Sequence, residues 1–149
     1  MNIQFAHINI VSEDPDSLSK FYQAVFGCEI VPPKRDISGD WLDRATGVKN
    51  AHLKGMHLRL PGFEENGPTL EIYQYDNMED RPESAANRKG FGHIAFSVDD
   101  VARVRELVLA NGGSDLGEIT RAEIPGAGTI QFLYMKDPEG NILEIQRWN

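Results

Sequence analysis

The sequence predicts an α+β fold made of two tandem copies of one strand–helix–strands module. Residues 6–10, with the sequence Ala-His-Ile-Asn-Ile, are echoed 86 positions later by residues 92–96, Gly-His-Ile-Ala-Phe. A second echo, Leu-Glu-Ile at residues 70–72, returns 73 positions later at residues 143–145. Two echoes in the same order, each with its polar residue in the same place, indicate an internal duplication. The first copy therefore carries 13 extra residues, which we place between about positions 31 and 50.

The first copy is predicted to contain a strand, a helix and three further strands. Apolar and polar residues alternate over residues 4–11, which favours a half-buried strand. Asp14 followed by Pro15 is a typical helix start, with an N-cap carboxylate and a proline in the first turn. Apolar side chains at helical spacing then run to Gly27, which ends the helix. The further strands are predicted near residues 28–32, 52–60 and 69–75.

The second copy repeats this order. A strand is predicted over residues 91–98, followed by a helix that begins at Asp99 or Asp100 and ends at the Gly112-Gly113 pair. Its remaining strands are predicted near residues 114–120, 128–135 and 141–147, and residues 125–128 form either a hairpin turn or a flexible loop. The polar residues between the copies lack periodicity. We therefore expect one domain over residues 1–149, with a module at 1–76, a linker at 77–90 and a module at 91–149.

The composition is that of an ordinary globular domain and disfavours several classes of partner. The chain has 149 residues, of which 40% are apolar and 26% are charged, so it can bury a core of its own. Its net charge of −8 disfavours binding to nucleic acid or to an anionic membrane surface. Because no apolar run approaches the roughly 18 residues of a membrane span, and the first residues do not resemble a signal peptide, we expect a cytoplasmic protein. The single cysteine, Cys28, excludes an intrachain disulfide and a zinc site built from thiolates.

Four polar residues within the two echoes lie on the strand faces opposite the apolar core. Alternate apolar residues mark the core face of the first strand, which puts His7 on the other face. The same alternation puts Glu71, His93 and Glu144 on the outer faces of their strands. Histidine and glutamate together are typical ligands of a divalent ion such as Ni, Zn, Co, Mn or Fe(II). One such residue alone would more often be an ordinary structural side chain, but the repeated pattern favours four ligands that converge from one side of a curved sheet.

Several other polar or aromatic residues are weaker candidates for contacts to a substrate. His57 shares its strand face with Arg59, and could line the same cavity or be part of its wall. Trp41 falls within the 13 extra residues, where ordinary packing and a short helix over the site are both consistent with the sequence. The candidate substrate-binding residues are Asn9, Tyr73, Ser97, Gln146, His57, Arg59 and Trp41.

These features together resemble the vicinal oxygen chelate superfamily, which includes glyoxalase I, methylmalonyl-CoA epimerase, extradiol dioxygenases and fosfomycin or bleomycin resistance proteins. The resemblance rests on the segment from Asp14 to Gly27, on residues 92–98, and on the turn at residues 137–141 with the Leu-Glu pair that follows. It implies a pair of βαβββ modules whose curled mixed sheets form a metal-binding cleft, commonly in a homodimer. It also implies the metal ligands His7, Glu71, His93 and Glu144, the ordered set of bacterial glyoxalase I.

One departure separates the chain from glutathione-dependent glyoxalase I. Those enzymes carry an arginine four residues after the first ligand and an asparagine four residues after the second, where this chain has Val11 and Tyr75. The resemblance thus implies the metal chemistry without the glutathione site. We expect a lyase or isomerase that removes and returns a proton next to a metal-polarised carbonyl of a small substrate, with Glu144 as the base and Glu71 as the second choice.

Three alternatives stay open on the sequence alone. A methylmalonyl-CoA epimerase-like enzyme has the same architecture, although its second ligand is often glutamine where this chain has Glu71. An Fe(II) extradiol-type dioxygenase would use two histidines and one glutamate together with further acid–base histidines, which fits less well. A non-catalytic protein that binds small molecules such as drugs would use the same clefts, but such proteins usually lack the complete metal set.

Overall fold

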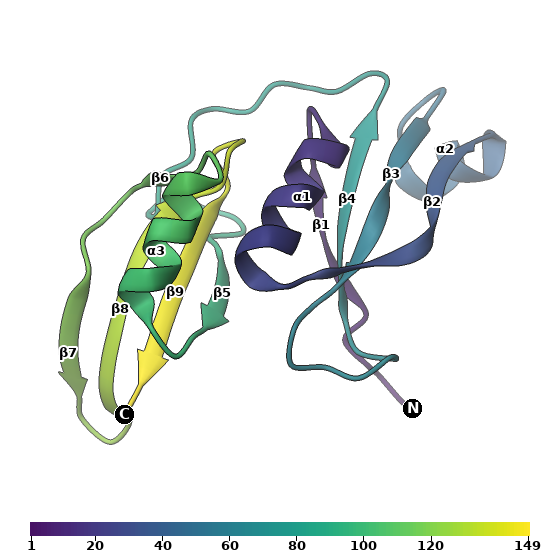
Figure 1. Ribbon diagram of the computed structural model, residues 1–149. Coiled ribbons are helices and arrows are strands. Elements are labelled where there is room, and N and C mark those ends of the chain that lie inside the picture. Colours follow the sequence, from purple (N-terminus) through teal and green to yellow (C-terminus); the bar gives the residue numbers. More distant parts are fainter. The chain divides into compact units, whose positions relative to one another are not determined.

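The computed structural model describes all 149 residues of the chain, which form two compact units, Met1–Arg81 and Pro82–Asn149 (Figure 1). Each unit has one mixed sheet with a helix packed on it, so the predicted α+β class is confirmed. The first unit contains β1 (His7–Val11), α1 (Pro15–Phe26), β2 (Glu29–Ser38), α2 (Asp40–Thr46), β3 (His52–Arg59) and β4 (Thr69–Tyr75). The second unit contains β5 (Ile94–Ser97), α3 (Val101–Ala110), β6 (Ser114–Asp115), β7 (Thr120–Ile124), β8 (Gly128–Lys136) and β9 (Ile142–Trp148). None of the three helices is long and apolar enough to cross a membrane.

In the first unit, α1 packs on one face of a four-stranded sheet with the order β1-β4-β3-β2 (Figure 1). β1 runs parallel to β4, and the other neighbouring strands are antiparallel. The buried apolar side chains of this layer include Leu18, Phe21, Tyr22 and Val25 on α1 and Met56, Leu58, Leu70 and Ile72 on the sheet. This burial fixes the strand register, because a slip by one residue would turn the apolar set outward. The odd-numbered residues of β3 and β4 therefore point away from α1.

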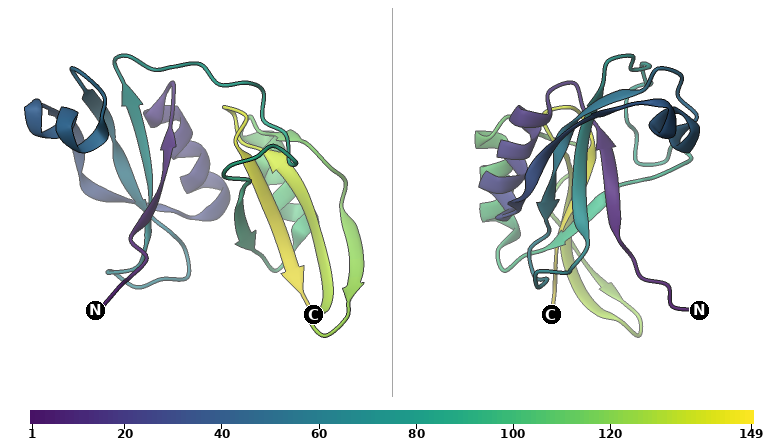
Figure 2. Two further views of the ribbon diagram at one scale, coloured as in Figure 1. Left: turned by 180° about the vertical axis from the view of Figure 1, so that it is seen from behind. Right: turned by 90° about the vertical axis from the view of Figure 1, so that its right-hand side faces the viewer.

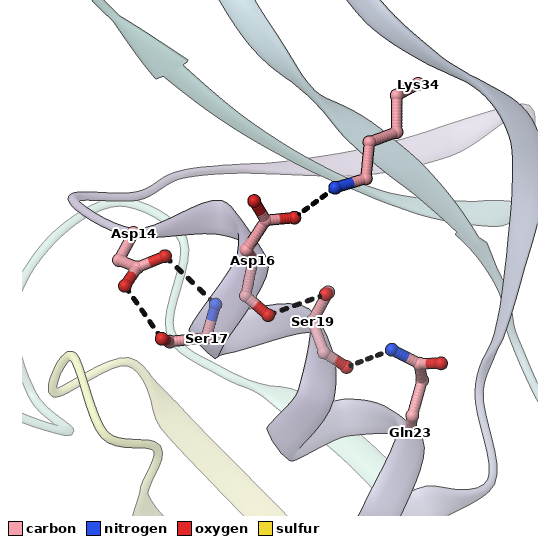
Figure 3. A network of polar contacts seen from close by, with 6 residues as sticks. All are labelled: Asp14, Asp16, Ser17, Ser19, Gln23 and Lys34. Atoms are coloured by element: carbon pink, nitrogen blue, oxygen red, sulfur yellow. Dashed lines mark hydrogen bonds and ion pairs between the residues drawn. The ribbon is translucent and has the colours of Figure 1, made fainter.

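The start of α1 carries the N-cap predicted for it (Figure 3). Asp14 accepts hydrogen bonds from the backbone amide of Ser17 at 3.0 Å and from the Ser17 hydroxyl at 2.7 Å. These two bonds, the backbone bond foremost, hold the pKa of the Asp14 carboxyl below its ordinary value. The Asp16 carboxylate in the same turn contacts Lys34 of β2. The first turn of α1 is thereby tied to the outer strand of the sheet.

The extra residues of the first copy include α2, which lies on the side of the sheet opposite α1 (Figure 2). The cluster beneath α2 consists of the buried Leu42, Ala51 and Leu53 with the partly buried Ile37, Val48, Tyr73 and Tyr75. The Asp43 carboxylate accepts hydrogen bonds from the backbone amides of Asn50 and Ala51, at 2.7 and 2.8 Å, and so closes the loop after the helix. Trp41 is 54% exposed. Packing of Leu42, and not of Trp41, therefore anchors α2.

Strand β2 is longer than the strand predicted over residues 28–32. It continues from Glu29 to Ser38 and pairs with β3 at both ends, with a shift of register between Val31 and Arg35. The two prolines within this shift cannot donate backbone hydrogen bonds, but a strand with a free outer edge tolerates that loss. Predicting the end of the strand at the prolines was therefore wrong.

The second unit has the strand order β5-β9-β8-β6, with β7 also paired to β8, and α3 packs on β8 and β9 (Figure 1). The single strand predicted over residues 114–120 was wrong, because β6 and β7 are separate segments. The backbone amides of Leu116 and Gly117 both bond to the carbonyl of Tyr134, at 3.2 and 2.9 Å. The regular hydrogen-bond ladder with β8 is therefore interrupted between β6 and β7. Residues 125–128 form a hairpin turn between β7 and β8 and not a flexible loop.

Candidate metal site

The first unit brings His7 and Glu71 together on the sheet face opposite α1. His7 begins β1, and Glu71 lies in the middle of β4, its parallel neighbour. The Nε2 atom of His7 is 3.4 Å from Oε2 of Glu71. Leu70 and Ile72, on either side of Glu71, are fully buried. Because side chains alternate along a strand, the burial of these two neighbours turns the Glu71 carboxylate toward the other face.

The second unit brings His93 and Glu144 together in the same way. His93 directly precedes β5, and Glu144 lies on β9, the parallel neighbour of that strand. The Nε2 atom of His93 is 2.8 Å from Oε2 of Glu144. Tyr134, opposite Glu144 on β8, places its ring centroid 4.8 Å from that of His93. The side chains of Glu144 and Glu71 are only 13% and 11% exposed, so each carboxylate is largely withdrawn from water beside an imidazole.

The donor atoms of both pairs are spaced as two ligands of one ion would be. A divalent ion holds imidazole nitrogen and carboxylate oxygen at about 2.1 Å, which puts neighbouring ligand atoms about 3 Å apart. The observed separations of 3.4 and 2.8 Å bracket that value. No group of three or more His, Cys, Asp or Glu side chains is arranged to hold a metal ion. Each pair thus fits two ligands of a divalent ion. The two pairs lie on two separate sheets, one in each copy of the repeat, and not on the single curved sheet that was expected.

A further imidazole, that of His57 on β3, lies against Glu71. Its Nε2 atom is 3.1 Å from Oε1 of Glu71 and 2.6 Å from the hydroxyl oxygen of Tyr73. Burial lowers the pKa of His57 although the Glu71 carboxylate opposes the shift, so the ring is neutral at pH 7. Burial, and next the charge of Glu71, raise the pKa of Tyr73 to about 12, so the phenol keeps its proton. Strand alternation places His57 on this face, but its contact with Glu71 depends on the β3–β4 register.

Three more of the candidate substrate residues share faces with the ligand pairs. Asn9 lies opposite Glu71 in the β1–β4 register. Ser97 and Gln146 lie opposite each other on β5 and β9, and Gln146 is two residues beyond Glu144. Asn9 and Gln146 therefore lie on strands that carry predicted ligands, and Ser97 lies on the strand that directly follows His93.

The remaining candidates are engaged elsewhere. The Arg59 guanidinium donates to the Glu29 carboxylate at 2.9 Å, at the outer edge of the first sheet. Trp41 lies exposed on α2. Among the seven candidates for substrate contacts, His57 places a ring nitrogen 3.1 Å from the carboxylate of a predicted metal ligand.

Asp36, His52 and Asp76 form a polar cluster that joins β2, β3 and the residue after β4, and no prediction from the sequence included it. The two ring nitrogens of His52 lie 2.6 Å from the Asp36 carboxylate and 2.7 Å from that of Asp76. Hydrogen bonds to Asp36 and then to Asp76 raise the pKa of His52, and the bond from His52 lowers the pKa of Asp36. A ring that donates to a carboxylate from both nitrogens is protonated. No spacing in the sequence signals this cluster, because it depends on the registers of two strand pairs.

We expect His52 to stabilise the fold at low pH and to lose this effect at high pH. Its pKa in the folded chain lies above the ordinary value of 6.5, so its contribution is complete below that value and is lost as the pH rises through the raised pKa. Thermal melts of the wild type and of His52→Gln should differ at pH 6 and converge at pH 9. An equal difference at both pH values would contradict a charged cluster.

Comparison with known proteins gives matches that span both copies of the repeat. Residues 4–145 match the family model described as the Glyoxalase/Bleomycin resistance protein/Dioxygenase superfamily. A protein of Arabidopsis thaliana named lactoylglutathione lyase is 31% identical over 147 residues, which are 97% of this chain and 44% of that protein. A probable lactoylglutathione lyase of Vibrio parahaemolyticus is 26% identical over 146 residues, which are 97% of this chain and 90% of that protein. The chain thus spans less than half the length of the plant relative.

A solved structure shows the same fold. The crystal structure of a glyoxalase family protein from Bacillus cereus has a TM-score of 0.77 and covers 99% of this chain and 94% of its own. The two sequences are 16% identical, so this likeness concerns the fold alone. It agrees with the mixed α+β architecture that the internal repeat predicted.

Proposed function

Because the chain belongs to the Glyoxalase/Bleomycin resistance protein/Dioxygenase superfamily, we propose that it is a divalent-metal-dependent enzyme of the glyoxalase type. In this proposal the enzyme is a lyase or isomerase that moves a proton next to a carbonyl group of a small substrate. The observation that carries the proposal is the His–Glu contact found on equivalent strands of each unit. The relatives named lactoylglutathione lyase support this class of reaction.

The proposal assigns one ion to four ligands, which are His7, Glu71, His93 and Glu144. Two imidazole nitrogens and two carboxylate oxygens suit Ni, Zn, Co, Mn or Fe(II), and an ion held by these four residues would leave room for substrate oxygens. When bound, the ion supplies the positive charge that polarises the substrate carbonyl. The two carboxylates balance that charge, which the low exposure of both side chains would otherwise make costly.

We propose Glu144 as the base, with Glu71 as the second choice. The Glu144 carboxylate takes the proton from the hydroxyl-bearing carbon beside the carbonyl and returns it to the carbonyl carbon, while the hydroxyl proton moves to the former carbonyl oxygen. One carbon–hydrogen bond breaks and another forms, so the reaction needs no oxidant or reductant. The 13% exposure of the Glu144 side chain limits exchange of that proton with water during the transfer.

Val11 and Tyr75 argue against glutathione as the thiol part of the substrate. Val11 is 51% exposed at the end of β1 and offers no side-chain hydrogen bond. Tyr75 packs against the cluster beneath α2. We therefore propose a hemithioacetal of another thiol as the substrate. A methylmalonyl-CoA epimerase-like reaction is the second candidate, because it requires no glutathione.

The test is an activity screen of chelator-treated protein reconstituted separately with Ni²⁺, Co²⁺, Mn²⁺ or Zn²⁺. The substrates are methylglyoxal hemithioacetals of glutathione, cysteine and coenzyme A, together with 2-methylacyl-CoA thioesters. We expect turnover of a hemithioacetal that requires the added ion. Failure of every substrate with every ion would refute the proposal, and ring opening of a catechol by the Fe(II)-loaded protein would replace it with the dioxygenase alternative.

A further inference from the structure

The two His–Glu pairs differ in what surrounds the glutamate. Glu71 and Glu144 hold equivalent places in the repeat, but His57 lies opposite Glu71 on β3, whereas a tyrosine lies opposite Glu144 on β8. His57 reaches Oε1 of Glu71 at 3.1 Å, and His7 lies 3.4 Å from Oε2. The Glu144 carboxylate contacts one imidazole, that of His93. Glu71 is therefore held through both of its oxygens and Glu144 through one.

His57 is itself held in a fixed orientation. The Tyr73 hydroxyl lies 2.6 Å from its Nε2 atom, and the hydroxyl of Thr69 lies 3.4 Å from its Nδ1 atom. The imidazole meets the Tyr73 ring edge to face, with the centroids 5.8 Å apart. The side chain of His57 is 19% exposed, so water competes little for these contacts. A side chain restrained in this way can orient the carboxylate that it touches.

Tyr73 connects this arrangement to the cluster beneath α2. Its ring is one of the partly buried side chains that pack against Leu42 and Leu53. The ring also lies over Gly55 of β3, where a Cβ atom would be 2.7 Å from Cδ1 of Tyr73. The glycine thus provides the space that the tyrosine ring occupies. Tyr73 therefore contacts both the cluster beneath α2 and His57, which in turn contacts Glu71.

We propose that His57 is a positioning residue that fixes Glu71 as the stationary carboxylate of the metal site. The His57 Nε2 atom lies 2.6 Å from the Tyr73 hydroxyl and 3.1 Å from Oε1 of Glu71, while Oε2 of Glu71 faces His7 at 3.4 Å. This inference rests on the proposed function, in which Glu71 and His7 bind the same ion. It also gives the two glutamates different parts: Glu71 stays in place, and Glu144, which lacks a second imidazole, can turn to take the proton.

The test compares the binding of Co²⁺ to chelator-treated wild type, His57→Leu, His57→Gln and Tyr73→Phe. The readouts are the dissociation constant and the visible absorption bands of bound Co²⁺, which report the ligand arrangement and not merely a folded chain. Residues that contact a metal ligand without binding the metal themselves typically contribute about 10–100-fold to metal affinity. We therefore expect His57→Leu to weaken Co²⁺ binding by about that factor and to shift the absorption bands. His57→Gln retains an N–H donor and should recover most of the affinity. His52→Gln, which removes an imidazole from the other face of β3, is the matched control and should bind as the wild type does.

Two results would overturn the inference, and only one of them would also overturn the proposed function. If the wild type binds Co²⁺ and His57→Leu binds it with the same constant and bands, the positioning role is wrong while the proposed function stands. If the wild type binds no Co²⁺, the proposed function fails and the inference fails with it. Should His57→Leu not fold, Tyr73→Phe decides, because unchanged binding overturns the role and weakened binding with shifted bands supports it.

Discussion

Glu144→Gln is expected to lower kcat by about 10²–10⁴-fold, the usual contribution of a general base. Glutamine keeps the size of the side chain and an oxygen for the ion, but its amide cannot accept the substrate proton as a carboxylate does. The measurement is steady-state kinetics on the substrate that the activity screen identifies, with metal content determined for each sample.

The matched control for this variant is Glu123→Gln, which neutralises an exposed carboxylate on β7 of the same unit. It should retain the wild-type kcat, because that side chain lies outside the proposed site. Full activity of Glu144→Gln with the ion bound would contradict the assignment of the base. The same experiment on Glu71→Gln would then examine the second choice.

His7→Gln and His93→Gln are each expected to weaken Ni²⁺ binding by more than about 10–100-fold, because each removes a direct ligand. A change of about 10–100-fold is typical when only a residue that contacts a ligand is replaced. The proposal assigns both histidines to one ion. Either variant alone should therefore reduce the affinity of the same site. Calorimetric titration of chelator-treated protein measures this effect, with melts of the metal-free variants as the check on folding. A wild-type affinity in one variant and a weakened affinity in the other would contradict a shared ion.

Much of the fold could be predicted because its signals are local. The Asp14 N-cap and the Gly27 stop lie next to the helix that they bound, and alternation along β4 alone places Glu71 on the face opposite Leu70 and Ile72. Because the second copy repeats the pattern of the first, each element and candidate ligand predicted in the first copy predicts its counterpart in the second. This is why His93 and Glu144 could be proposed together with His7 and Glu71.

The features that were missed depend on contacts between strands. The prolines of β2 are tolerated because β2 is an edge strand, and the sequence does not show which strand lies at the edge. The interruption between β6 and β7 lies where the backbone amides of Leu116 and Gly117 both bond to the carbonyl of Tyr134. Whether two amides meet one carbonyl depends on how this segment is aligned with β8. Register also brings His57 to Glu71 and Asp36 to His52. Residues far apart in the chain gain such partners only when the sheet forms.

The central claim is that His7, Glu71, His93 and Glu144 are ligands of a single divalent ion. The most direct test is the number of ions bound per chain, measured by equilibrium dialysis of chelator-treated protein against Ni²⁺ followed by metal analysis. We predict one ion per chain, and a loss of that ion when either His7 or His93 is replaced. Two ions per chain, each lost with its own histidine, or no ion at all, would contradict the claim.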